Sequence, residues 1–357
     1  MQPALLTFSI LLTLSFSACN SNSLQDSDAS SERKNQYIYA HLEGHIQDQF
    51  YSLDLTISDT TVFGNYYLDD REEPLDVFGS YHVNDSLYLN ESITNRFTNK
   101  EDEKYNYFVG KFSNGTYSGL FITPDTTFSF EFKSVKKSNI VEFDFIQASD
   151  SVVEPISQKT IAHIDFESPM VKDTQYVFLH NAIYALMGDT NFAGDMKGFM
   201  KRKTSLNLNE IDTASLTNMK KKPDYYANYS DVTYNKNNRV IFSNSSMKFS
   251  NGMHESFQIK YCTVDLTTKK QLSIKDVLTQ DEIQKLPSLL EQKFRSKFKL
   301  NKTEPLEKVL YYNDNRFMNG NYFITHKGIG FLYNTHEITG FSYGPIALYV
   351  LFDEIKK

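Results

Sequence analysis

Residues 319–352 read NGNYFITHKGIGFLYNTHEITGFSYGPIALYVLF, and this stretch carries the clearest folding pattern in the chain. Residues 321–325 and 329–334 are apolar-rich runs separated by a tight turn at Lys327-Gly328, which is the pattern of a β-hairpin. Residues 346–352 are almost wholly apolar and predict a third strand. A strand that is apolar on both faces belongs inside a sheet or under a helix.

The residues before this stretch predict helices alternating with strands. Residues 276–300 place apolar side chains at intervals of three and four, which predicts a helix with Pro287 in its first turn. Two earlier helices are expected at 173–187 and 192–203. Alternating runs predict strands at 159–166, 225–233, 239–249 and 256–266. Together these elements predict an α+β domain over residues 159–357, with helices on one face of an antiparallel sheet.

Residues 36–134 have a different pattern, made of short alternating runs punctuated by turn residues. About eight strands are expected, and such a β-rich meander closes most simply into a small antiparallel barrel or sandwich. Four strands carry a glycine two residues before an aromatic residue, at Gly64, Gly79, Gly110 and Gly119. Glycine within a strand permits close approach or bending of the backbone. Residues 135–158, which contain Pro155, are expected to be a linker.

The first 35 residues predict export. Residues 4–16 form an uncharged apolar run, which is shorter than the ~20 residues that a membrane span needs. A short apolar core followed by small residues is typical of an export signal. Phe16-Ser17-Ala18-Cys19 resembles a bacterial lipoprotein box, so residues 1–18 are expected to be the signal peptide, with Cys19 lipid-modified and inserted in a lipid bilayer. The polar residues 19–35 suit a flexible tether. An ordinary secretory signal with a chance cysteine is the alternative.

The C-terminal half resembles a known family through several short motifs. They are Phe249 to His254, Asn321 to Thr325, Gly328 to Tyr333 and Tyr343-Gly344-Pro345. These residues resemble the extracytoplasmic domain of lysozyme-sensing anti-sigma factors, which is also found beside the catalytic domain of some peptidoglycan deacetylases. The resemblance implies a protein ligand such as lysozyme, or another cell-wall component. The ligand contacts then expected are His254, Thr335, His336 and Tyr343.

Composition and motifs say less about chemistry. The formal net charge of −7 makes nucleic acid an unsuitable partner, because phosphate binding requires clustered basic side chains. His41, Glu43 and His45 alternate along one strand and share a face, so they are either a solvent-exposed face or a zinc ligand set. Cys262 lies in an alternating strand and is interpreted as a small buried hydrophobic residue, with a reactive thiol as the alternative.

No strong catalytic motif is found, and no cofactor is expected. The favoured hypothesis is an exported, lipid-anchored protein of the bacterial cell envelope, located at the periplasmic face or the cell surface. It would act as a non-catalytic binding module that binds or inhibits lysozyme or another cell-wall-associated ligand. The alternatives are a cell-wall glycan hydrolase or deacetylase, and a purely structural envelope protein.

Overall fold

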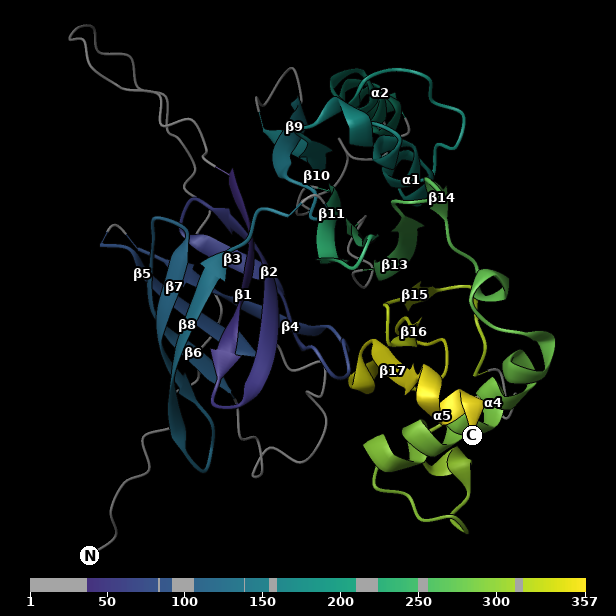
Figure 1. The fold of residues 1–357 in the computed structure, drawn as a ribbon. Helices are drawn as coiled ribbons and strands as arrows, with labels where there is room; N and C mark the ends of the chain where they lie inside the picture. The colour runs from purple at the N-terminus through teal and green to yellow at the C-terminus, as the bar shows by residue number, and fades with distance from the viewer. Residues whose placement is uncertain are drawn as a thin grey trace, which may run out of the picture. The chain divides into compact units, whose positions relative to one another are not determined.

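The computed structural model describes residues 37–82, 84–91, 106–137, 139–153, 159–209, 224–249, 256–311 and 317–357. They belong to one compact unit, Asn35–Lys357, shown in Figure 1. The expected signal peptide, tether and lipidation site at Cys19 lie outside the described residues, as does the candidate contact His254.

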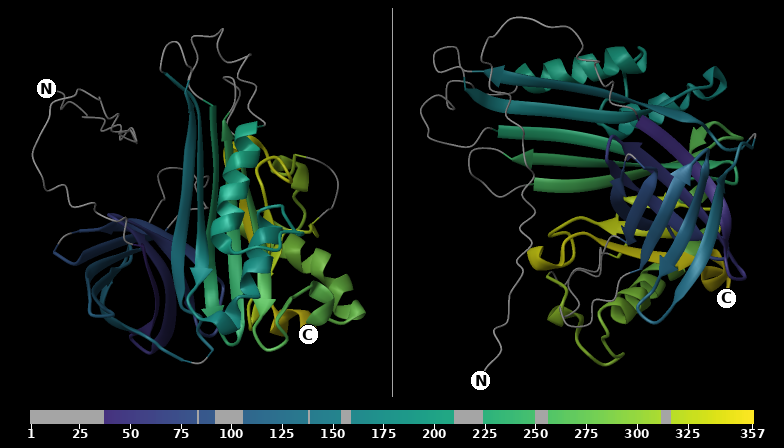
Figure 2. Two further views of the ribbon diagram at one scale, coloured as in Figure 1. Left: turned by 90° about the horizontal axis from the view of Figure 1, so that it is seen from above. Right: turned by 90° about the vertical axis from the view of Figure 1, so that its left-hand side faces the viewer.

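The first eight strands form a closed antiparallel barrel in which each strand pairs with the next and β8 pairs back to β1. The strands are β1 (Tyr37–Ile46), β2 (Gln49–Ser58), β3 (Thr61–Leu68), β4 (Leu75–Tyr81), β5 (Ser86–Glu91), β6 (Tyr107–Ser113), β7 (Thr116–Ile122) and β8 (Thr127–Ser134). Figure 2 shows the barrel from two further directions. Of the two arrangements expected from the sequence, the barrel is the one found.

Aromatic side chains fill the barrel interior. The rings of Phe108, Phe121 and Phe132 belong to the buried cluster, and Phe108 lies 4.6 Å from Phe121 between ring centroids. Glycines let neighbouring strands approach each other around these rings. Gly110 and Gly119 face each other across β6 and β7, where a Cβ on Gly119 would lie 2.1 Å from the backbone oxygen of Val109. The expected role of these glycines in close approach is confirmed.

A six-stranded sheet follows, with the spatial order β14-β13-β12-β11-β10-β9. Its strands are β9 (Phe143–Val153), β10 (Thr160–Val171), β11 (Asp224–Lys236), β12 (Arg239–Phe249), β13 (Ser256–Asp265) and β14 (Lys270–Gln271). Two expectations were wrong. The segment 135–158, expected to be a linker, contains β9, and β10 pairs with β11 in parallel, so that the sheet is mixed.

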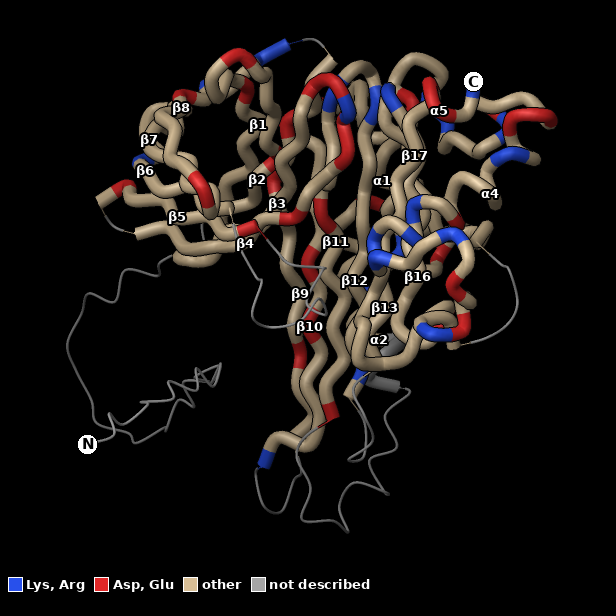
Figure 3. Tube along the Cα trace, turned by 90° about the horizontal axis from the view of Figure 1, so that it is seen from below, with Lys and Arg blue, Asp and Glu red and all other residues tan. Residues whose placement is uncertain are grey.

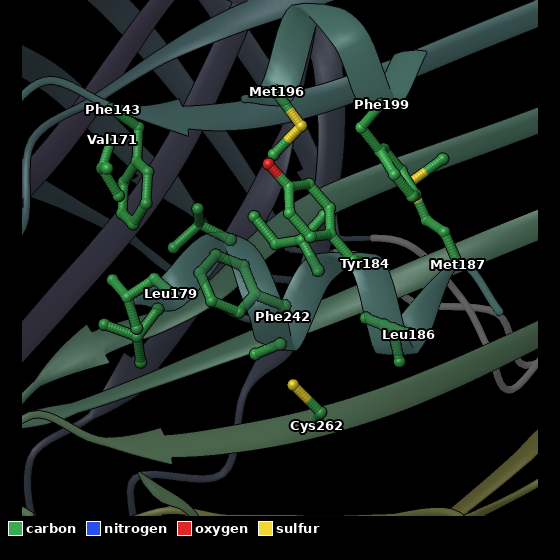
Figure 4. Packing of buried hydrophobic residues seen from close by; sticks show 14 of the residues in the cluster. Phe143, Val171, Leu179, Tyr184, Leu186, Met187, Met196, Phe199, Phe242 and Cys262 are labelled. Atoms are coloured by element: carbon green, nitrogen blue, oxygen red, sulfur yellow. The ribbon is translucent and has the colours of Figure 1, made fainter. Parts of the chain in front are cut away.

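Helices cover one face of this sheet. The short η1 (Thr174–Tyr176) leads into α1 (Leu179–Leu186), and α2 (Met196–Asn209) follows. Gly188 comes directly after Met187, the C-cap of α1, and its φ of +85° suits glycine. Figure 4 shows how side chains from α1 and α2 pack on residues of the strands. Cys262 is 4% exposed within this cluster. Burial also raises the pKa of its thiol to about 12, so the interpretation of Cys262 as a small buried hydrophobic residue is confirmed.

A separate three-stranded antiparallel sheet closes the chain, in the order β15-β16-β17. Its strands are β15 (Tyr322–Ile324), β16 (Gly328–Tyr333) and β17 (Ile346–Leu351). The helical elements of this region are η2 (Ile274–Asp276), α4 (Gln280–Lys297), η3 (Leu306–Lys308), η4 (Phe341–Tyr343) and α5 (Phe352–Lys356). The apolar face of α4, including Leu286, Leu290 and Phe294, belongs to the same buried cluster as these strands. Pro287 lies inside α4 and not in its first turn, contrary to the expectation.

No helix in the part of the chain that the structure describes is both long and apolar enough to cross a membrane.

Candidate functional site

The loop between β16 and β17 holds most of the contact residues expected from the sequence. Backbone contacts hold it at its start and in its middle. The backbone N–H of Glu337 donates to the carbonyl oxygen of Asn334 (2.9 Å), and the N–H of Tyr311 donates to the carbonyl oxygen of Ile338 (2.9 Å). Leu310 and Thr339 form a β-bridge. These backbone contacts give the loop one defined conformation.

Three aromatic side chains from this loop and the segment beside it form an exposed group. Phe341 is 60% exposed and Tyr311 is 61% exposed, the largest values among the exposed large hydrophobic residues in the described part of the chain. The exposed His336 ring lies 5.5 Å from the Phe341 ring, and Tyr311 lies beside Gly340. We call His336, Phe341 and Tyr311 the aromatic patch. Large aromatic side chains on a fixed backbone are the usual anchors of protein–protein contacts.

The other candidate contacts have different positions. Thr335 is half-buried next to His336. Tyr343 is also half-buried, and its ring packs edge-on against Phe298 of α4 at 5.5 Å, so it supports the loop from behind. The sequence did not single out Phe341 or Tyr311. Both are large aromatic residues in segments rich in turn-forming residues, and this pattern could have indicated that they are exposed.

A polar cleft of about 500 Å³ borders the loop. Its lining residues come from α1, β13, β14 and the turns around β15 and β16; they are Ala185, Leu186, Gln258, Lys260, Tyr261, Cys262, Gln271, Asn319, Gly320, Asn321, Asn334 and Glu337. Glu337 follows His336 in the chain, so the cleft and the aromatic patch are neighbours. Asn321 and Asn334 are already occupied, because their side-chain amides bond to the backbone of β13.

A second polar group lies where the outer side of the barrel meets β11. The carboxylate of Asp54, in β2, is fully buried and accepts from several partners. Tyr39 (2.5 Å) and Tyr67 (3.0 Å) donate their hydroxyl groups to it, the backbone N–H of Asn235 donates at 3.1 Å, and Nδ1 of His41 lies 2.7 Å away. Because Asn235 is in β11, this carboxylate joins the barrel to the six-stranded sheet.

His41 belongs to this junction and is not a solvent-exposed residue. It is 3% exposed, and its Nε2 lies 3.5 Å from Glu43, which is also 2.6 Å from Lys137. Burial opposes the charged form of His41, but the neighbouring Asp54 and Glu43 outweigh it and raise the pKa of His41 to about 9. Burial likewise disfavours the charged form of Glu43, but His41 and Lys137 lower the pKa of Glu43 to about 2.

The zinc set expected from His41, Glu43 and His45 is therefore not assembled. His45 is exposed, and its ring packs edge-on against Phe50 at 4.9 Å, while His41 points to Asp54. Across the residues that the structure describes, no group of three or more His, Cys, Asp or Glu side chains is placed to hold a metal ion. The other expectation, a solvent-exposed face, is also wrong at His41, which is buried beside Asp54 and Glu43.

Acidic residues recur on β9, β10 and β11, as Figure 3 shows. Tyr37 donates to Glu167 (2.9 Å), and Tyr229 donates to Asp165 (3.1 Å). Burial raises the pKa of Glu167 to about 7, although the bond from Tyr37 offsets part of this rise. Burial, with a smaller contribution from the nearby acidic groups, raises the pKa of Asp231 to about 8. The pKa of Asp231 therefore lies above neutral pH, and the pKa of Glu167 lies close to it.

Comparisons with known proteins bear mainly on the C-terminal region. A family model described as "Protein of unknown function (DUF3298)" matches residues 275–352, which include the aromatic patch. A solved DUF3298-family protein from Bacteroides fragilis NCTC 9343 is similar, with a TM-score of 0.52 and 19% identity over 62% of this chain and 94% of that one. A DUF3298-family protein from Pseudomonas aeruginosa PAO1 gives a TM-score of 0.44 and 14% identity over 60% and 93% of the two chains. None of the curated proteins matches. The C-terminal region therefore matches the DUF3298 model, and the covered part of the chain shares its fold with the Bacteroides protein.

Proposed function

We propose that this protein is an exported envelope lipoprotein that acts as a non-catalytic, protein-binding module. The observation that carries the proposal is the aromatic patch, because Phe341 and Tyr311 are 60% and 61% exposed on a loop whose backbone is fixed. Exposed aromatic side chains that are grouped on one surface are typical of protein-binding sites. The lipid anchor at Cys19 is part of the same proposal and is supported by the sequence around that residue.

Lysozyme is the proposed partner, because the motifs at 321–325, 328–333 and 343–345 resemble the lysozyme-sensing family. The polar cleft borders the loop that carries His336 and Phe341, and exposed aromatic residues with polar surroundings on one loop suit a protein interface with an apolar centre and a polar rim. Binding at the substrate groove of lysozyme would inhibit it. The net charge of −7 assists the approach of a basic partner.

The test is calorimetric titration of the fragment Asn35–Lys357, which is a compact unit, with lysozymes of the main structural types. We expect saturable binding together with protection of cells in a lysis assay. Phe341→Ala is expected to weaken binding by about 2 kcal/mol, roughly thirtyfold, because it removes an aromatic anchor.

The matched control is Val177→Ala. Val177 is 49% exposed and lies outside the C-terminal sheet and its loops, so truncating it removes exposed apolar surface elsewhere. Equal affinities of Phe341→Ala and the unchanged fragment would exclude the aromatic patch as the contact. Absence of heat and of protection at micromolar concentration would exclude lysozyme as the ligand.

A further inference from the structure

The barrel has an exposed apolar surface of its own, far in sequence from the aromatic patch. Phe78, Tyr88, Val109 and Leu120 are 45%, 37%, 39% and 48% exposed. They come from four consecutive strands, β4 to β7. We call these four residues the barrel patch.

The strand register makes the barrel patch continuous. Tyr88 lies opposite Val109, and Val109 lies opposite Leu120, so three of the side chains form one cross-strand row. Phe78 begins the adjacent row, which continues through Asn90 and two further apolar residues. Directly opposed side chains on one sheet face are in contact distance, so the row is a single surface.

Neither row contains a charged residue. The two rows comprise Ser80, Tyr88, Val109, Leu120 and Ser129, then Phe78, Asn90, Tyr107, Ile122 and Thr127. The next row contains charged residues, because Lys111 and Glu131 lie on either side of Ser118. The two rows thus form an uncharged area of Tyr, Phe and aliphatic side chains, bordered by Ser, Thr and Asn. This composition matches protein surfaces at the membrane–water interface, where tyrosine rings are enriched.

The size of the barrel patch favours a membrane over a second copy of the chain. Large apolar side chains have roughly 150–250 Å² each, so the four exposed fractions amount to roughly 300 Å². A stable protein dimer buries roughly 800 Å² on each partner. A patch of this size gives only weak association between free molecules, but a tether raises its effective concentration at the surface to which the chain is anchored.

The tether has a suitable length. Residues 20–36 separate Cys19 from Tyr37, the first residue of β1. A segment of this length reaches at most roughly 60 Å even when fully extended, so the covalent connection limits how far β1 can lie from the anchor. The barrel begins at Tyr37 and is therefore the part of the described chain nearest in sequence to Cys19.

We propose that the barrel patch lies on the membrane to which the chain is anchored, with its rings at the boundary between the lipid headgroups and the acyl chains. This inference rests on the lipid anchor of the proposed function. By lying against the membrane, the barrel would fix the orientation of the protein, and the C-terminal aromatic patch would be presented in a defined direction.

The chain contains no tryptophan, so a single introduced tryptophan reports its own surroundings. The fragment Asn35–Lys357 would carry an N-terminal polyhistidine tag and be attached to vesicles of phosphatidylethanolamine and phosphatidylglycerol that contain a nickel-chelating lipid. Leu120→Trp is the reporter, and Val177→Trp is the control at an equally exposed position outside the barrel. With brominated acyl chains, we expect the quenching of Leu120→Trp to be at least about threefold that of Val177→Trp, because interfacial rings contact the upper acyl chains.

The tag supplies the tether, so failure of lipidation at Cys19 in cells leaves this measurement interpretable. Equal quenching of the two tryptophans, or none at position 120, would overturn the proposal. A blue shift of Leu120→Trp that grows with protein concentration in the absence of vesicles would also overturn it, because a second copy would then be the occupant. Val109→Trp, in the same row, repeats the measurement if the substitution of Leu120 alters folding.

Discussion

At the scale of single residues, the glycines inside the barrel strands are constrained by the neighbouring backbone. A Cβ on Gly119 would lie 2.1 Å from the carbonyl oxygen of Val109 and 2.5 Å from the Cα of Gly110. These are backbone atoms of the paired strand, so a rotamer change cannot relieve the overlap. Gly119→Ala is expected to lower the free energy of unfolding by about 1–3 kcal/mol, measured by urea denaturation.

Gly320→Ala is the control for this prediction, because no heavy atom lies within 4 Å of the added Cβ. We expect it to leave the denaturation midpoint nearly unchanged. A Gly119→Ala variant as stable as the parent would show that β6 and β7 can separate without cost, and the close-approach interpretation would fail.

His41 shows what the sequence could and could not reveal at this scale. The alternation of His41, Glu43 and His45 correctly predicted a common face of the strand opposite the barrel interior. It could not predict the burial of His41, because its partner Asp54 lies at a junction with β11, where the backbone N–H of Asn235 donates to the same carboxylate. Periodicity reports which residues share a face, but not what covers the face.

At the scale of elements, two asparagine side chains join the C-terminal sheet to β13. The backbone N–H of Tyr261 donates to Oδ1 of Asn321 (3.0 Å), and Nδ2 of Asn321 donates to the carbonyl oxygen of Ile259 (2.7 Å). Asn334 makes an equivalent pair of bonds to the N–H and the carbonyl oxygen of Ile259. The side-chain amides thus stand in for a neighbouring strand at the edge of β13.

Removing the amide of Asn321 deprives the Tyr261 N–H of this acceptor, whereas the carbonyl oxygen of Ile259 keeps its bond from Asn334. Asn321→Ala is expected to destabilise the protein by about 1–3 kcal/mol and to raise amide hydrogen exchange at Tyr261, because its N–H loses its acceptor. Gln271→Ala, an exposed residue of the same cleft, serves as the control. Unchanged exchange at Tyr261 in Asn321→Ala would show that the amide pairing does not hold the two sheets together.

The strand positions were largely predictable, but the direction of pairing was not. Strand β12 has the bounds expected from the sequence, 239–249, because alternation and turn residues define strand ends locally. The parallel pairing of β10 with β11 was missed. Its signal was the long helical connection through α1 and α2, since parallel neighbours require a crossover of this kind.

At the scale of the whole molecule, buried ionisable groups predict how stability depends on pH. The pKa of His41 is raised to about 9 in the folded state, so its contribution is complete below about pH 6.5 and is lost as the pH rises through 9. Glu167 and Asp231 have folded-state pKa values of about 7 and 8. Because the unfolded chain releases these protons at lower pH, their burial also becomes destabilising as the pH rises from about 4 to 8.

His41, Glu167 and Asp231 each contribute less stability as the pH rises, so the melting temperature is expected to decrease as the pH is raised from 5 to 9. Below pH 4.5 the lowered pKa of Glu43 acts in the opposite sense, and stability is lost as the pH falls towards 2. In Asp231→Asn the decline between pH 5 and pH 8 should be shallower, whereas Glu307→Gln, at an exposed position, should retain the parent profile. Superimposable profiles for Asp231→Asn and the parent would show that Asp231 is ionised in the folded protein.

The arrangement of the candidate site depends on contacts that no local pattern encodes. The motifs at 321–325 and 328–333 are structural, and they predicted the hairpin and the loop that holds His336. The juxtaposition of Tyr311 with that loop arises from the Leu310–Thr339 bridge, which joins segments separated by a stretch of other elements. A resemblance carried by turns and core residues therefore located the domain, but not the exposed rings that we propose as its contact surface.

In the proposed function, the protein binds its partner through the aromatic patch. Hydrogen–deuterium exchange of Asn35–Lys357 with and without lysozyme tests this claim most directly, because it reports the protected segment without changing a residue. We predict slower exchange for the segments that contain Tyr311, His336 and Phe341, with the barrel unaffected. Protection confined to the barrel or to the six-stranded sheet, or no protection at saturating lysozyme, would contradict the claim.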